Sequence, residues 1–174
     1  MNRKFTTNEI ILGGLLLATG ILLPMVFHIF SLTGPIALPM HIPVLMGGFL
    51  LPPQLALLLG ITTPFISSVL TGMPVLFPMA IIMSLELGTY GLVASLATRK
   101  LKLSPVLSLL ASMAAGRIAA GVTVALLVVL FGVKMNPFMF VKGAIITGLP
   151  GIIIQLIFIP SLVYAIKAYK RADI

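Results

Sequence analysis

Two charged side chains lie deep inside apolar stretches of the sequence, where a charge is costly if the surroundings are lipid. Glu86 follows the outer start of the 75–98 stretch by about 11 residues, and Arg117 follows the inner start of the 104–131 stretch by about 13. At about 1.5 Å per residue both reach the middle of a bilayer, and Gln155 reaches a similar depth. Two interpretations stay open and can hold together: a structural ion pair with an amide beside it, or direct contact with a bound molecule.

His41 is a second polar candidate, because it stands beside Met40 and Pro43 in a proline-rich segment. An imidazole on irregular backbone can donate or accept a hydrogen bond to a solute, although a lone histidine is often a satisfied interfacial residue. His28, near the end of the first apolar stretch, is a less favoured candidate.

The segment from 71 to 86 combines a Gly-x-Pro turn with several methionines, a phenylalanine and a second proline. Such side chains form an adaptable apolar wall that suits a flat organic molecule, whereas any one of them alone is more simply explained by packing or lipid contact. The predicted substrate-binding residues are therefore His41, Met40, Met73, Pro78, Met79, Met83, Glu86, Tyr90, Arg117 and Gln155. The polar 133–143 segment, with Lys134 and Lys142, reads as a turn that could act as a lid.

Catalytic and metal chemistry have little support in this sequence. It contains no cysteine, no HExxH, no Walker loop and no acidic metal motif, and its apolar stretches contain no Ser/His pair. We therefore expect no enzyme activity, no metal site and no cofactor in this chain.

The composition predicts what must position these side chains. Hydrophobic residues make up 60% of the 174 and charged residues 8%, whereas about a quarter of the residues in a soluble domain are charged. A spanning helix needs about 20 apolar residues, so the length allows about six spans and no separate soluble domain. We expect an all-α integral membrane protein, a compact bundle of six transmembrane helices that forms one domain over residues 1–174.

Proline, glycine and charge clusters divide the chain into six predicted helices. The second is too short to cross a bilayer alone and is crowded by prolines, so a binding cavity is first expected there. The predicted helices cover residues 7–30, 40–51, 53–71, 75–98, 104–131 and 138–167.

The basic residues predict the orientation. Eleven basic residues oppose three acidic ones, and eight of the eleven lie in the N-terminus, the 98–103 loop and the C-terminus. The positive-inside rule then places both termini in the cytoplasm. Because these residues flank apolar runs and are not interleaved with exposed aromatics, we expect a membrane surface as partner and no nucleic acid.

The pattern LPMHIPVLMGGFLLPP, followed by GITTPFISSVLTGMPVLFPMAIIMSLELGTYGLVASL, resembles the substrate-binding S components of energy-coupling-factor (ECF) vitamin importers. The resemblance implies a bacterial cell-membrane protein with six helices that binds a vitamin or precursor near the outer face. It also implies a transmembrane coupling subunit and two cytoplasmic ATPases as partners, so that ATP is used outside this chain. The family's helix 1 often carries Ala-x-x-x-Ala for docking, and Gly14 and Ala18 occupy the corresponding place here.

The charge pair and the methionines favour some ligands over others. A charge-balanced Glu86/Arg117 interior beside a methionine-rich wall suits a neutral, partly aromatic molecule, such as the cobalamin precursor dimethylbenzimidazole or its riboside. Pantothenate is the second candidate, if Arg117 or Lys142 is available to its carboxylate. A standalone proton-coupled carrier that uses Glu86 as its relay is the alternative function.

Overall fold

The computed structural model describes residues 5–29 and 34–172, and these residues form helices with no β-strand among them. Five helices are long and apolar enough to cross a membrane, and a sixth, α3, is shorter. In chain order the helices are α1 (Thr7–Ile29), α2 (Gly34–Ala37), α3 (His41–Leu50), α4 (Pro53–Thr71), η1 (Leu76–Ala80), α5 (Ile81–Arg99), α6 (Pro105–Phe131) and α7 (Pro137–Ala172).

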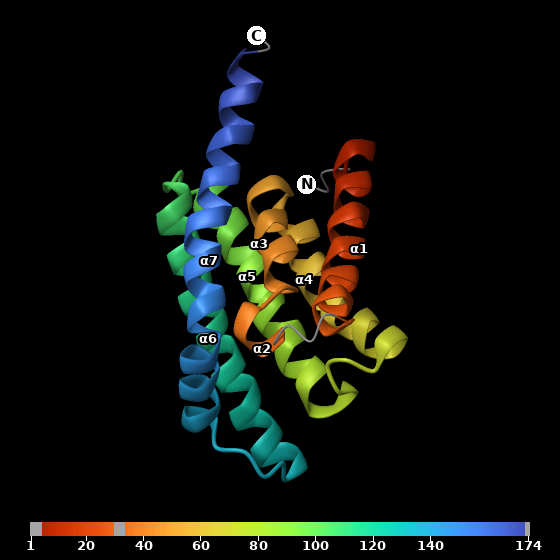
Figure 1. Cartoon of the computed structure of the whole chain (residues 1–174). Helices are drawn as coiled ribbons and strands as arrows, with labels where there is room; N and C mark the ends of the chain where they lie inside the picture. The colour runs from red at the N-terminus through yellow and green to blue at the C-terminus, as the bar shows by residue number, and fades with distance from the viewer. Residues whose placement is uncertain (1–4, 30–33, 173–174) are drawn as a thin grey trace.

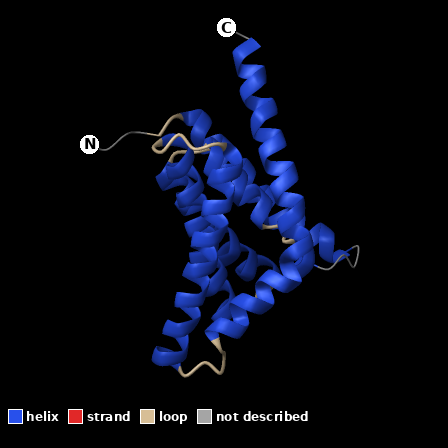
Figure 2. Ribbon diagram, turned by 90° about the vertical axis from the view of Figure 1, so that its left-hand side faces the viewer, coloured by secondary structure: helices blue, strands red, loops and turns tan. Residues whose placement is uncertain are grey.

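Helix α5 is the centre of the bundle and contacts α3, α4, α6 and η1 (Figure 1). Helix α1 packs on α3 and α4 at one side, while α7 packs on α6 at the other. The C-terminal end of α7 extends beyond the other helices in both views (Figures 1 and 2). Large apolar side chains cover the outside, for example Leu15 at 62% exposure and Ile118 at 68%, as expected where lipid replaces water.

Helices α4 and α5 approach each other closely because both lack side chains at the crossing. A Cβ atom at Gly60 would overlap the backbone of Leu87, and one at Gly91 would overlap the backbone of Ala56. Small residues at such contacts let membrane helices pack backbone against backbone. This contact fixes the position of α5, which carries Glu86.

The helix ends follow local rules. Pro53 and Pro105 occupy the first turns of α4 and α6, where the missing amide costs nothing. The Ser104 side chain accepts a hydrogen bond from the Leu107 amide at 3.3 Å. Helices α4 and α6 end at Gly72 and Gly132, both with positive φ.

The segment before α5 differs from the continuous helix predicted from residue 75. Phe77 is extended (φ −124°, ψ 129°), so that η1 is an irregular turn and regular helix begins at Ile81. Pro78 lacks an amide hydrogen and restrains the residue before it, which explains the interruption. The predicted helix end at Phe30 lies outside the described residues.

Two further differences concern the segment before α3 and the C-terminal end of the last helix. A short helix, α2, precedes α3 and packs on α7, where Gly151 leaves no room for a side chain against the backbone of Ile36 and Ala37. The last helix runs to Ala172, five residues past the predicted end at Lys167. Apolar periodicity ends near that lysine, but polar residues continue a helix readily in water.

Candidate functional site

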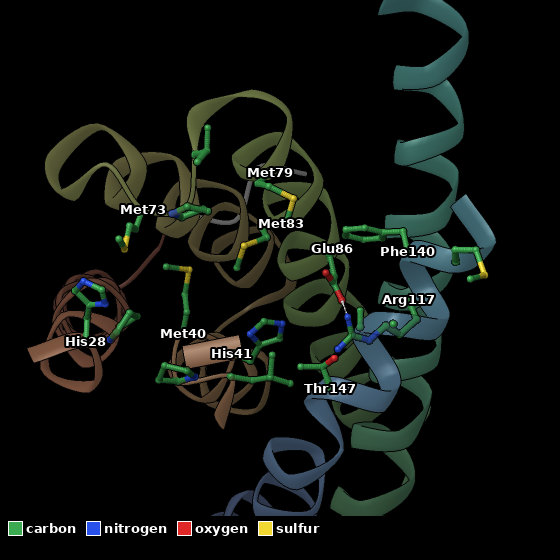
Figure 3. Close-up of a pocket in the computed structure, with 18 residues that line it drawn as sticks. His28, Met40, His41, Met73, Met79, Met83, Glu86, Arg117, Phe140 and Thr147 are labelled. Atoms are coloured by element: carbon green, nitrogen blue, oxygen red, sulfur yellow. Dashed lines mark ion pairs between the residues drawn. The ribbon is translucent and has the colours of Figure 1, made fainter. Parts of the chain in front are cut away.

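A cavity of about 750 Å³ lies where α1, α3, α5, α6 and α7 converge (Figure 3). Its lining comes from all of these helices and from the connections before α3 and before α5. The lining residues are Pro24, His28, Leu38, Pro39, Met40, His41, Met73, Pro74, Val75, Met79, Met83, Glu86, Arg117, Met139, Phe140, Gly143, Ala144 and Thr147.

The predicted ion pair between Glu86 and Arg117 is present and forms one side of this cavity (Figure 3). Arg117 Nη1 lies 2.6 Å from Glu86 Oε1, and the two side chains are 12% and 4% exposed. The hydroxyl of Tyr90 donates a second hydrogen bond to the same carboxylate oxygen at 3.1 Å. The pair joins α5 to α6 and leaves the cavity with balanced formal charge.

Three buried nitrogen atoms at this side have no hydrogen-bond partner among the described residues: Nδ1 and Nε2 of His41 and Nη2 of Arg117. Buried polar groups are normally paired, and leaving one unpaired costs roughly 1–3 kcal/mol. Both residues line the cavity, but these three nitrogens are covered by neighbouring atoms, so a turn of either side chain is needed before a molecule inside can bond to them. Arg117 offers a donor there, and a neutral imidazole offers one donor and one acceptor.

Apart from His28 and Thr147, the rest of the cavity lining is apolar and adaptable. Five methionines (Met40, Met73, Met79, Met83 and Met139) and Phe140 line it. The labelled Met40, Met73, Met79 and Met83 lie on the side away from Arg117, so that the cavity has a thioether-rich part and a polar part (Figure 3). Thioethers and aromatic rings pack well against flat aromatic molecules.

Most of the residues predicted from the sequence meet at this cavity. Its lining includes Met40, His41, Met73, Met79, Met83, Glu86 and Arg117. Tyr90 and Gln155 instead line a smaller neighbouring cavity of about 240 Å³, which shares Arg117 and Leu38 with the large one. Gln155 Nε2 donates to the Leu38 carbonyl at 3.4 Å and makes no hydrogen bond to the ion pair. Pro78 lines neither cavity.

The sequence reasoning missed much of the lining from α1, from the connections and from α7. His28 was disfavoured, yet it lines the cavity. Met139 and Phe140 belong to the 133–143 segment, which was predicted to be a turn that could act as a lid and in which only Lys134 and Lys142 were considered for anion binding. Neither lysine lines the cavity. The residues not foreseen are Pro24, Leu38, Pro39, Pro74, Val75, Met139, Phe140, Gly143, Ala144 and Thr147. Each of these segments has a short apolar face in the sequence, but such a face looks the same whether it lines a cavity or packs against a helix.

The fold and the cavity together define a multi-pass helical membrane protein that can enclose a small organic molecule. The profile of the ECF transporter substrate-specific component matches residues 8–163, and the chain therefore belongs to this family. A component of this kind works with the coupling and ATPase modules of an ECF importer and supplies its substrate specificity; the family is a transport family and no enzyme class. No curated protein and no solved structure gave a match.

Proposed function

We propose that this chain is the high-affinity substrate-binding subunit of an ATP-driven ECF importer for a vitamin or vitamin precursor. The observation that carries the proposal is the 750 Å³ cavity, whose polar side holds unpartnered nitrogens of His41 and Arg117. Its volume lies in the range of about 300–1,000 Å³ that is usual for small-molecule sites.

The balance of charge favours a neutral ligand. Arg117 is already neutralised by Glu86, so a free carboxylate would have to compete with a buried partner 2.6 Å away. A neutral, partly aromatic molecule can instead accept from Arg117 Nη2, bond to His41 and stack among the thioethers. Dimethylbenzimidazole or its riboside fits this description, and pantothenate is the second choice because Nη2 could still receive its carboxylate.

Titration calorimetry with the purified protein tests the choice of ligand. We expect tight binding of dimethylbenzimidazole or its riboside and weaker binding of pantothenate. The His41→Phe variant should weaken binding at least tenfold, whereas Leu85→Ala, on the exposed face of α5 beside Glu86, should not. Equal affinities of His41→Phe and wild type would contradict a ligand at this cavity.

The subunit is proposed to act in a bacterial cell membrane with both termini in the cytoplasm and with six spans, α3 serving as the second. Its partners are a transmembrane coupling subunit and two ATPases, and ATP is hydrolysed by those ATPases. The basic 98–103 loop and C-terminus support this orientation.

Reconstitution separates this proposal from a standalone proton-coupled carrier. Proteoliposomes with the chain and a coupling module should take up ligand only when ATP is enclosed in the lumen, on the side to which the ATPases of an importing complex face. Uptake by the chain alone, driven by a pH gradient and abolished in Glu86→Gln, would favour the carrier instead.

A further inference from the structure

Tyr90 lies behind the polar side of the large cavity and does not line it. Its ring is 2% exposed, one helical turn after Glu86 on α5, and its hydroxyl donates to Glu86 Oε1 at 3.1 Å. The same ring lies 5.6 Å from the His41 ring, centroid to centroid, at an interplanar angle of 60°. Tyr90 therefore contacts Glu86 and His41, two of the polar residues that line the cavity.

A glycine on the neighbouring helix makes room for this ring. A Cβ atom at Gly116 would overlap the Tyr90 ring carbons Cε1 and Cδ1, and it would lie 3.1 Å from the carbonyl oxygen of Glu86. An aromatic ring in a buried site cannot move aside as the end of a flexible side chain can. The absence of a side chain at Gly116 thus determines how closely the Tyr90 ring can pack against α6.

Arg117 follows Gly116 directly, so the same point of α6 both supports the ring and supplies the guanidinium. One oxygen of the Glu86 carboxylate, Oε1, accepts from both Arg117 Nη1 and the Tyr90 hydroxyl. A shift of the ring would consequently move the carboxylate, the ion pair and the imidazole together.

From this geometry we infer that Tyr90, wedged against Gly116, is a positioning residue that fixes the direction in which His41 and the Glu86–Arg117 pair face the ligand. This inference rests on the proposed function, since it assigns a role within the same binding site. Tyr90 acts through its neighbours and makes no ligand contact of its own.

The first test compares binding and stability in four variants, with dimethylbenzimidazole as the probe. Gly116→Ala should weaken binding at least tenfold, and Tyr90→Phe, which keeps the ring and loses the hydroxyl, should weaken it less. In Gly116→Ala/Tyr90→Ala the overlap is removed, so thermal stability should recover relative to Gly116→Ala while the affinity does not. Gly13→Ala is the matched control, because its Cβ meets only Leu51 Cδ1 at 3.8 Å. Affinity within twofold of wild type in the double variant would reduce Tyr90 to a packing residue.

A second, ligand-free measurement keeps the inference separate from the choice of ligand. The sequence contains two histidines, so ¹³C-labelled imidazoles give one signal each, and a His28→Gln variant assigns them. The His41 signal should move in Gly116→Ala and in Tyr90→Ala and stay nearly unchanged in Tyr90→Phe, with His28 as internal reference. An unmoved His41 signal in Gly116→Ala overturns the inference even if the ligand is correct. Failure of the wild type to bind any vitamin overturns the proposed function, while the His41 signal still decides the role of Tyr90.

Discussion

The two terminal nitrogens of Arg117 lie in different surroundings. Nη1 holds Glu86, while Nη2 is buried without a partner among the described residues; Arg117 as a residue lines both cavities. The ion pair was predictable from the sequence, because two isolated charges reached the same depth on helices that follow one another. The position of Tyr90 behind the cavity was not, because it depends on the absence of a side chain at Gly116.

Removal of one partner of this ion pair should destabilise the protein more than removal of both. In Arg117→Gln the Glu86 carboxylate stays buried without its cation, and we expect a loss of about 3 kcal/mol in the free energy of unfolding. Glu86→Gln/Arg117→Gln should recover most of that loss. Reversible unfolding in mixed micelles measures both, with Ile118→Ala, on the lipid-facing side of α6, as control. An unchanged unfolding midpoint in Arg117→Gln would contradict a buried structural pair.

The helices could be predicted to within a few residues wherever proline, glycine or a cap marked their ends. The 53–71 helix agrees at both ends, since Pro53 starts it and Gly72 stops it. The interruption at Phe77 and the short helix α2 were missed, because both depend on packing against other helices as well as on local proline content. The same reason explains why α7's contribution to the cavity could not be predicted: helix–helix approach is set by side chains distant in sequence.

One predicted consequence concerns the ends of α3 and α5. Arg99 Nη2 donates to the Leu50 carbonyl at 2.8 Å and its Nε to the Leu51 carbonyl at 3.1 Å, while Ser95 Oγ donates to Leu51 at 2.8 Å. These bonds satisfy carbonyls that the end of α3 leaves free. Arg99→Met should therefore cost about 1 kcal/mol, a modest value because the arginine is exposed. The neighbouring exposed Lys100→Met should cost almost nothing; equal effects would argue against a capping role for Arg99.

A second consequence concerns the crossing of α4 and α5. Because a Cβ at Gly60 would meet backbone atoms, the helices must separate to admit it, and Gly60→Ala should lower the thermal midpoint by several degrees. Gly13→Ala adds the same methyl group where only ordinary contact results and should leave the midpoint near that of wild type. If Gly60→Ala and Gly13→Ala have the same thermal midpoint, the two helices are less tightly packed at this crossing than described.

At the scale of the whole molecule, α1 has a part that lines the cavity and a part that is exposed on the outside of the bundle. Helix α1 contributes Pro24 and His28 to the cavity, whereas its Gly14 and Ala18 are exposed; Gly20 is its only buried residue among those described. A Cβ at Gly14 would meet nothing within 4 Å. This exposed helix face is consistent with the docking role that the family resemblance implies for Gly14 and Ala18, which stays a prediction.

Bulky residues on that face should affect assembly alone. We expect Gly14→Leu/Ala18→Leu to keep wild-type thermal stability and wild-type ligand affinity, because neither change intrudes on the bundle. Co-purification with a tagged coupling module should fall strongly in the same variant. Unchanged co-purification of this variant with the coupling module would place the docking surface elsewhere.

The most direct test of ligand binding in the cavity is a thermal-shift measurement with a blocked variant. Ala144→Trp places an indole into the cavity from α7, and Ile146→Trp places the same ring on the exposed side of that helix. A vitamin or precursor at about 100 times its Kd adds about 2.7 kcal/mol to the stability of the folded state. At least one compound of a panel that includes dimethylbenzimidazole, its riboside and pantothenate should stabilise wild type and Ile146→Trp, and it should not stabilise Ala144→Trp. Full stabilisation of Ala144→Trp, or no stabilisation of wild type by any compound, would contradict a ligand in this cavity.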